Sequence, residues 1–404
     1  MRRGIQLLAG VLLLCASSVV SAQGATPQEI AELRAQVAAL MARLEALEAQ
    51  SVESRPAAPA VAAAPPVAAA SWTDSLRFAG DFRYRHESID DAAEAYHARH
   101  RIRARINATA EVADNMKVGF GLSTGGITND SGNQTLDGGF SYKPIDLDLA
   151  YFDWGINDDL NLLAGKMPNP FFRPGSYHLI YDSDIRPEGL ALKYTSGDFF
   201  GNVSAFWVEE RSSASDSMLI GLQGGYRSAL DNGARLTVGA SYYDTSNAQG
   251  ELPFFTPTDG QGNQLDANGR YLYGFSEIEL FGQLQFNVGS KPVTLFADLV
   301  KNQDAEAFDQ GYAIGAEYGR TSAPGDWMIG YVYQDLEANA VIGAFTDSDF
   351  AGGTSDGSGH SILAGYVFPG GWNFGLRYIL GERGEAAGEL RDYNRLQADI
   401  SMRY

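Results

Sequence analysis

Polar and apolar residues alternate along many consecutive segments of this 404-residue chain, from residue 72 to residue 404. The clearest segment has apolar residues at every second position: Ile102, Ala104, Ile106, Ala108, Ala110 and Val112. A period of two is typical of a β-strand whose two faces meet different surroundings. One such strand could belong to a soluble sheet, but roughly sixteen in succession predict an all-β fold, a transmembrane antiparallel β-barrel.

The connectors between these segments alternate between short and long, as in a barrel whose tight turns all face one side of a membrane. The short connectors have hairpin-turn composition, for example Asp114-Asn115 and Gly197-Asp198. The long connectors cover residues 88–98, 125–144, 168–187, 245–273, 336–359 and 382–390. Two connectors break the rule, because 319–326 is long for a turn and 212–215 is short for a loop. The expected strand number is therefore sixteen to within about two.

The N-terminus has the features of a secretory signal peptide over residues 1–22. Arg2 and Arg3 precede an apolar run, and small residues end the segment at Ala22. No later stretch supplies about 18 consecutive apolar residues, so no transmembrane helix is expected. The single cysteine, Cys15, lies inside the signal, and the bulky Leu14 before it disfavours lipidation. The mature chain therefore has no thiol for a disulfide or a catalytic nucleophile.

Residues 23–50 have a heptad pattern, which predicts a short α-helical coiled coil in the periplasm. Its seam consists of Ile30, Leu33, Val37, Leu40, Leu44 and Leu47. A lone amphipathic helix lying on the barrel is the alternative, but a helix this short is marginal by itself. Residues 51–71 are mostly Ala, Pro and Val and predict an extended linker, with the barrel occupying 72–404.

The net charge of the chain is −20, and loss of the two signal arginines would make it still more negative. Phosphate backbones would be repelled, so no nucleic-acid partner is expected. The chain also has 46 glycines, 20 tyrosines and 21 phenylalanines. This composition suits tight turns and the aromatic girdles of a membrane barrel.

Two passages, residues 163–171 (LAGKMPNPF) and 181–192 (YDSDIRPEGLAL), resemble the putative porin family of proteobacterial outer membranes. The last strand, which alternates up to Tyr404, also resembles the assembly signal of bacterial outer-membrane proteins. The resemblance covers about residues 72 to 404. It implies a passive channel-forming barrel in the outer membrane of a Gram-negative bacterium, often a trimer, and it does not imply a substrate.

General porins fold their third long connector into the channel, and here that connector is residues 168–187. The resemblance therefore implies a constriction loop with these polar residues: Arg173, His178, Tyr181, Asp182, Asp184 and Arg186. Three prolines, Pro168, Pro170 and Pro174, would stiffen the loop. An ordinary surface loop tucked against the rim is the alternative.

Arginines recur at alternate positions of the first two predicted strands: Arg83, Arg85, Arg99, Arg101, Arg103 and Arg105. On a lipid-facing surface each would cost a few kcal/mol near the membrane midplane, so we expect them to line the pore. They could bias permeating ions or pair with Asp81, Glu111 and loop acids to hold the wall. A basic wall facing an acidic loop predicts weak anion preference or near neutrality, although the whole chain is acidic.

The function that fits these features is a water-filled porin for passive diffusion of small hydrophilic solutes and ions. The alternatives are a channel selective for anionic solutes and a barrel that only tethers the envelope. No catalytic residue, cofactor or metal site is expected, because the histidines lack metal-ligand spacing and no nucleophile elbow or P-loop is present.

The expected partners are outer-membrane lipid, lipopolysaccharide and two further copies of the chain in a homotrimer. The acidic excess is expected in the last two outer loops, at Asp347, Asp349, Asp356, Glu382, Glu385 and Glu389. There it would serve solubility or bind divalent cations shared with lipopolysaccharide.

Overall fold

The computed structural model describes residue 42 and residues 72–404, except 127, 213 and 232. The chain divides into two units, Met1–Ala69 and Ala70–Tyr404. The expected signal peptide (1–22), coiled coil (23–50) and linker (51–71) lie outside the described residues, apart from Ala42, which is helical. The six seam residues of the coil are among those not described. No helix among the described residues is long and apolar enough to cross a membrane.

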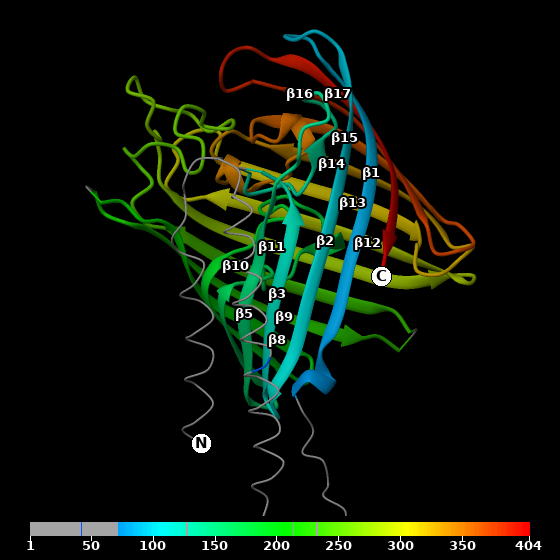
Figure 1. The fold of residues 1–404 in the computed structure, drawn as a ribbon. Helices are drawn as coiled ribbons and strands as arrows, with labels where there is room; N and C mark the ends of the chain where they lie inside the picture. The colour runs from blue at the N-terminus through cyan, green and yellow to red at the C-terminus, as the bar shows by residue number, and fades with distance from the viewer. Residues whose placement is uncertain (1–41, 43–71, 127, 213, 232) are drawn as a thin grey trace, which may run out of the picture. The chain divides into compact units, whose positions relative to one another are not determined.

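Sixteen long antiparallel strands form one closed ring, which confirms the predicted β-barrel (Figure 1). The strands are β1 (Arg77–Asp91), β2 (His97–Ala113), β3 (Met116–Thr124), β5 (Ile145–Asn157), β6 (Leu160–Lys166), β7 (Glu188–Ser196), β8 (Phe199–Glu209), β9 (Ser217–Ala229), β10 (Arg235–Thr245), β11 (Phe275–Val288), β12 (Lys291–Asn302), β13 (Gln310–Gly319), β14 (Trp327–Leu336), β15 (Gly357–Val367), β16 (Asn373–Arg383) and β17 (Arg391–Arg403). The two-residue β4 (Gln134–Thr135) pairs with β2 above the end of β3. Four short 3-10 helices complete the described elements: η1 (Trp72–Ser75), η2 (Pro174–Ser176), η3 (Gly343–Phe345) and η4 (Phe350–Gly352).

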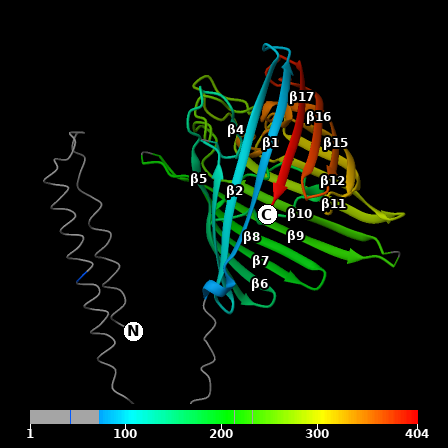
Figure 2. The same ribbon diagram turned by 45° about the vertical axis from the view of Figure 1, so that its right-hand side comes forward.

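The ring closes where the first long strand meets the last (Figure 2). The backbone of Tyr404 exchanges two hydrogen bonds with Gly80, with N···O distances of 2.9 and 3.1 Å. The Tyr404 hydroxyl also donates to the carbonyl of Arg105 (3.1 Å). Closure leaves none of the sixteen long strands as an unpaired edge.

The outer surface of the barrel is apolar and the inner surface is polar. Leu280 and Ile314 are more than half exposed on the outside, while Gln223 and Asp298 are buried inside. This distribution is the reverse of that in a soluble protein and fits a wall whose outside contacts lipid. Near the short turns the outer surface carries aromatic residues, including Trp327. This position fits the aromatic girdle that the composition suggested.

The short and long connectors lie at opposite ends of the barrel, as predicted. Gly197 and Gly289 adopt positive φ angles of 56° and 61° in two of the tight turns. The first long connector is shorter than expected, since β1 and β2 pair up to Ile89 and His97. Residues 303–309 form an additional loop that the sequence pattern did not indicate.

Two long loops fold into the barrel and form a core there. Loop 167–187 buries Met167, Phe171 and Leu179 in the same apolar cluster as Val341 of loop 337–356. Asn263, on loop 246–274, fixes loop 337–356 by donating to the carbonyls of Ala338 (2.6 Å) and Val341 (2.7 Å). The expectation that loop 337–356 is an exposed outer loop is therefore wrong.

The acidic residues of loop 337–356 therefore lie inside the barrel and not on an outer surface. Asp347 and Asp356 are buried, and Asp349 pairs with arginines inside the barrel. This loop has no alternating pattern, so its sequence did not indicate that its apolar residues, such as Val341, are buried together with these acids.

Candidate functional site

The six predicted arginines lie on the inner wall, on β1 and β2, and we call them the arginine ladder: Arg83, Arg85, Arg99, Arg101, Arg103 and Arg105. The strand register places Arg83 opposite Arg103 and Arg85 opposite Arg101. Residues directly opposite in an antiparallel pair share a face, so these side chains stand side by side. Like charges at that spacing repel, and the ladder therefore depends on acidic partners.

Loop 167–187 supplies one of these partners. Asp184 accepts an ion pair from Arg105 (Nη2 to Oδ1, 2.7 Å) and lies 3.4 Å from Arg103 Nη1. Arg103 also contacts Asp81 on the neighbouring strand at 2.9 Å. The middle of the ladder is thus tied both to the wall and to the inward loop.

The last strand and loop 337–356 supply further partners. Arg85 pairs with Asp399 (2.7 Å) and with Asp349 (3.0 Å). Arg83 is held less closely, at 3.8 Å from Asp399, and it donates to the Asn133 side chain (2.6 Å). These ion pairs and hydrogen bonds connect β1, β17 and two loops.

Glu87 lies at the centre of the part of the ladder that contains Arg99 and Arg101. Its side chain is 0% exposed and pairs with Arg99, Arg101 (3.5 Å) and Arg395 (2.6 Å). Arg395 in turn contacts Asp349 at 2.7 Å. A buried carboxylate with several guanidiniums holds all of them in place, because charge-assisted hydrogen bonds are strong where water is excluded.

The two acids of loop 167–187 have opposite electrostatic environments. Burial raises the pKa of Asp182 to about 8, and the charges of Asp184 and Asp347 add to the effect. Burial alone would also raise the pKa of Asp184, but Arg105 and Arg103 hold it well below its usual range. Asp184 is therefore ionised at neutral pH, whereas Asp182 is largely protonated.

The other predicted loop residues have mainly local contacts. Arg173 donates to the carbonyl of Tyr181 (3.1 Å), whose ring packs into the apolar cluster. Arg186 pairs with Asp148 on β5 at 3.1 Å. Burial lowers the pKa of His178 to about 4, so its imidazole is neutral.

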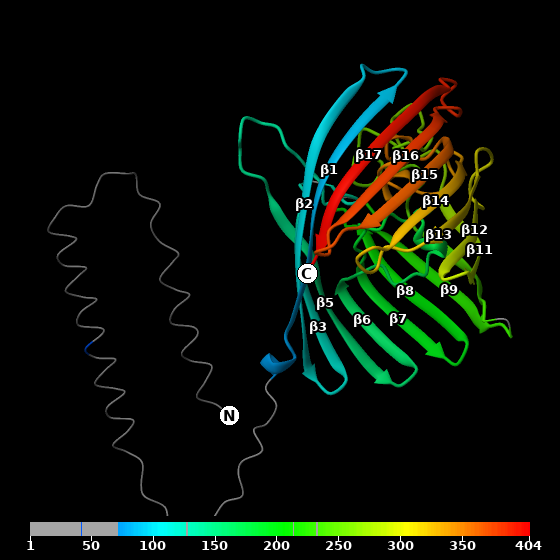
Figure 3. The same cartoon turned by 90° about the vertical axis from the view of Figure 1, so that its right-hand side faces the viewer.

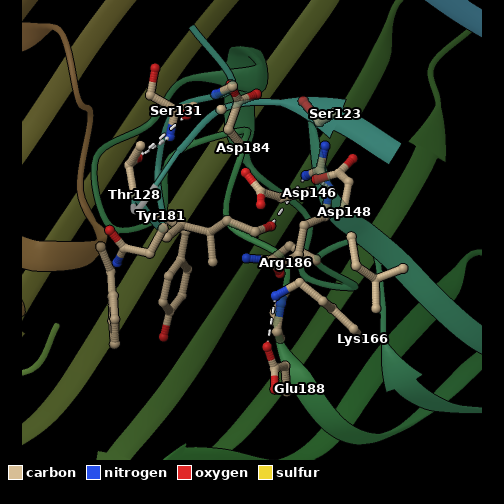
Figure 4. A pocket seen from close by; sticks show the side chains of 18 of the residues that line it. Ser123, Thr128, Ser131, Asp146, Asp148, Lys166, Tyr181, Asp184, Arg186 and Glu188 are labelled. Carbon is tan, nitrogen blue, oxygen red and sulfur yellow. Dashed lines mark hydrogen bonds and ion pairs between the residues drawn. The ribbon is translucent and has the colours of Figure 1, made fainter. Parts of the chain in front are cut away.

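Two cavities flank loop 167–187. One, of about 270 Å³, lies between the arginine ladder and the loop, with Arg83, Arg103, His178 and Asp184 in its lining. The other, of about 310 Å³, has mixed charges: Arg105, Asp146, Asp148, Lys166, Asp184, Arg186 and Glu188 (Figure 4). Figure 4 shows that the loop side chains and those of the wall converge across this space.

Several charged residues of the site were not among the predicted ones: Glu87, Asp347, Asp349, Arg377, Arg395 and Asp399. Alternation along the last strand does place Arg395, Gln397 and Asp399 on one face. Closure of a barrel makes the first and last strands neighbours, so this signal could have identified Arg395 and Asp399 as partners of the ladder. No periodicity exists in loop 337–356 to indicate Asp347 or Asp349.

The sequence matches the family described as putative porin over residues 89–271 and 263–404. The chain belongs to the putative porin family. The family and its fold are those of channel-forming barrels. A comparison with curated proteins finds no match.

Solved porins share the fold. OprB of Pseudomonas putida has a TM-score of 0.54 at 13% identity, covering 82% of this chain and 95% of that one. A triple mutant of the Rhodopseudomonas blastica porin scores 0.51 at 12% identity, covering 81% of this chain and 100% of that one. OmpF of Salmonella typhi, in complex with daunomycin, scores 0.51 at 12% identity, covering 82% and 99%. At these identities the likeness concerns the fold alone.

Proposed function

We propose that this porin is a water-filled channel in the outer membrane of a Gram-negative bacterium and passes small hydrophilic solutes and ions by diffusion. The observation that carries the proposal is the charged space between the arginine ladder and loop 167–187, inside a barrel with an apolar exterior. Charged side chains that face a lumen act directly on permeating ions.

We propose further that the narrowest part of the channel is this same space and that its selectivity is weakly anionic or nearly neutral. Ion pairing of the ladder with Asp184, Asp349 and Asp399 supports near neutrality. The looser contacts of Arg83 and the partial exposure of Arg99 support a residual positive charge. Distant surface carboxylates contribute little, since the Debye length is about 8 Å at physiological salt.

Planar-bilayer recording tests both proposals. The purified protein should give discrete ohmic steps, and its reversal potential in a KCl gradient should lie near zero or on the anion side. Replacing Arg103 and Arg105 together by alanine should move the reversal potential toward cation preference. A silent barrel would contradict the channel and favour a tethering role, whereas strong cation preference unaltered by the double change would make the ladder structural.

We also propose a trimer, with lipid and lipopolysaccharide around it. The segment 136–144, which follows β4, stands away from the wall (Figure 3) and carries Phe140 and Tyr142 with fully exposed side chains. Large aromatic side chains exposed in this way are characteristic of protein contacts. Cross-linking in outer membranes should yield a trimer, and replacing both aromatics by serine should reduce it; exclusively monomeric protein would contradict the proposal.

A further inference from the structure

His178, Asp182 and Asp347 come together inside the barrel, where loops 167–187 and 337–356 meet. One ligand atom from each side chain lies within 4.8 Å of the other two. His178 Nδ1 is 3.9 Å from Asp182 Oδ2. One imidazole nitrogen and two carboxylate oxygens on a common centre are a recognised donor set for a metal ion.

The backbone holds these side chains in place. The amide of Asp182 donates to the carbonyl of Phe345 (2.7 Å), and the Asp182 carboxylate accepts from the amide of Ser348 (2.9 Å). The Thr346 hydroxyl donates to the carbonyl of Leu179 (2.8 Å). The two loops are therefore already held against each other, which keeps the three side chains near one another before a metal ion binds.

The carboxylate of Asp347 is also oriented by its surroundings. It accepts from Arg377 Nη2 (2.8 Å) and from the amide of Asp349 (2.9 Å). Hydrogen bonds of this kind fix the ligand oxygens of metal sites and tune their basicity. Arg377 also offsets part of the charge that two neighbouring carboxylates would otherwise concentrate there.

The imidazole of His178 makes no close hydrogen bond or ion pair with the residues around it. Within the described part of the chain, neither of its ring nitrogens has a hydrogen-bond partner closer than the 3.9 Å contact to Asp182. Unpaired polar groups are costly inside a protein, and a bound ion with its waters would satisfy them.

The donor set selects among metals. Magnesium and calcium prefer oxygen ligands only, whereas an imidazole combined with carboxylates suits zinc and its first-row neighbours. Tetrahedral zinc, with ligand bonds of about 2.0–2.2 Å, requires donor atoms roughly 3.3 Å apart. Side-chain rotation can close the gap from the observed spacing, and the cavity of about 270 Å³ that His178 and Asp182 line has room for a completing water.

We propose that His178, Asp182 and Asp347 form a binding site for a divalent transition metal such as Zn²⁺, which joins the two inward loops at the edge of the channel. A bound ion adds positive charge opposite the arginine ladder, so loading the site favours anions in the pore.

Metal binding can be measured independently of conductance, so this proposal can fail while the channel proposal stands. The full mature chain, purified without a histidine tag, is titrated with Zn²⁺ by calorimetry. One Zn²⁺ per chain is expected, with affinity reduced about tenfold or more in His178→Gln and in Asp347→Asn. His360→Gln is the matched control, because His360 is already hydrogen-bonded to Tyr331 (2.8 Å) and should bind Zn²⁺ like the parent.

A second measurement covers variants that fold poorly. Heat-dependent migration in detergent gels establishes that each variant is a folded barrel, and Co²⁺ substitution reports the ligand set by its visible absorption. The parent and His360→Gln should give the same Co²⁺ spectrum, and His178→Gln should lose it. Equal Zn²⁺ affinity in the parent and a folded His178→Gln barrel would overturn the site, as would the absence of any Zn²⁺ binding by the parent.

Discussion

At the scale of single residues, the interior of the barrel is held together by a few carboxylates that each serve several arginines. Glu87 contacts three guanidiniums and is fully buried, and Asp184 joins the arginine ladder to loop 167–187. Alternation along the strands predicted that the arginines line the inner wall, because the sequence of a single strand determines which side chains share a face. Alternation alone does not predict that Glu87 meets Arg395, 308 positions away, because that contact also requires the closure of β1 onto β17.

Replacing Glu87 by alanine should destabilise the barrel strongly. The change leaves Arg99, Arg101 and Arg395 without the Glu87 carboxylate that they share. Removing one partner of a buried ion pair typically lowers the free energy of unfolding by about 3–5 kcal/mol. Urea-induced unfolding in detergent or lipid vesicles measures the loss. Glu111→Ala is the control, because Glu111 forms an exposed pair with Lys117 and should change the free energy of unfolding by less than about 1 kcal/mol. Equal effects would show that the arginines find other partners.

Replacing Asp184 by asparagine should make the pore more anion-selective, since Arg103 and Arg105 lose their common counter-charge. We expect the ratio of chloride to potassium permeability to rise by about twofold or more. Reversal potentials in a KCl gradient give the ratio. Asp137→Asn, which removes an exposed acid of an outer loop, should leave it unaltered. A ratio unaffected by Asp184→Asn would place the ion path away from the ladder.

At the scale of elements, strands were predictable and loops were not. Alternation with a period of two shows which residues share a face of a strand, so the barrel and a strand number of about sixteen follow from the sequence. Loop 337–356 has no period, and its inward course depends on tertiary contacts, such as the hydrogen bonds of Asn263 and the burial of Val341. The inward course of loop 167–187 came from a family resemblance rather than from its own residues.

Asn263→Ala should release loop 337–356. The substitution removes two side-chain donors to loop carbonyls and the acceptor for the amide of Gly343 (2.8 Å), a loss of about 1–3 kcal/mol. Cleavage by added protease within 337–356 should become faster than in the parent. Asn268→Ala, in an exposed turn of the same loop as Asn263, is the matched control. An unchanged cleavage rate would show that apolar packing alone retains the loop.

At the scale of the whole molecule, the barrel is a closed unit, and the N-terminal segment is expected to act on assembly rather than on the wall. The seam from Ile30 to Leu47 predicts a coiled coil that supports trimerisation, although Ile and Val alternating with Leu also fit a dimer. Deleting residues 23–71 should leave a folded barrel and weaken the oligomer, as native gels in increasing detergent would show. If the truncated protein resists dissociation as well as the full chain, the segment has another task.

The pairing of β1 with β17 has a consequence for the order of assembly. Every other junction between neighbouring strands joins segments close in sequence, whereas this one joins residues more than 300 positions apart, such as Asp81 and Arg403. Contacts between distant residues carry the largest loop-closure entropy and form slowly. We therefore expect the junction between β1 and β17 to close last. Until it does, the growing sheet has two open edges, and the pairing of these two strands removes both.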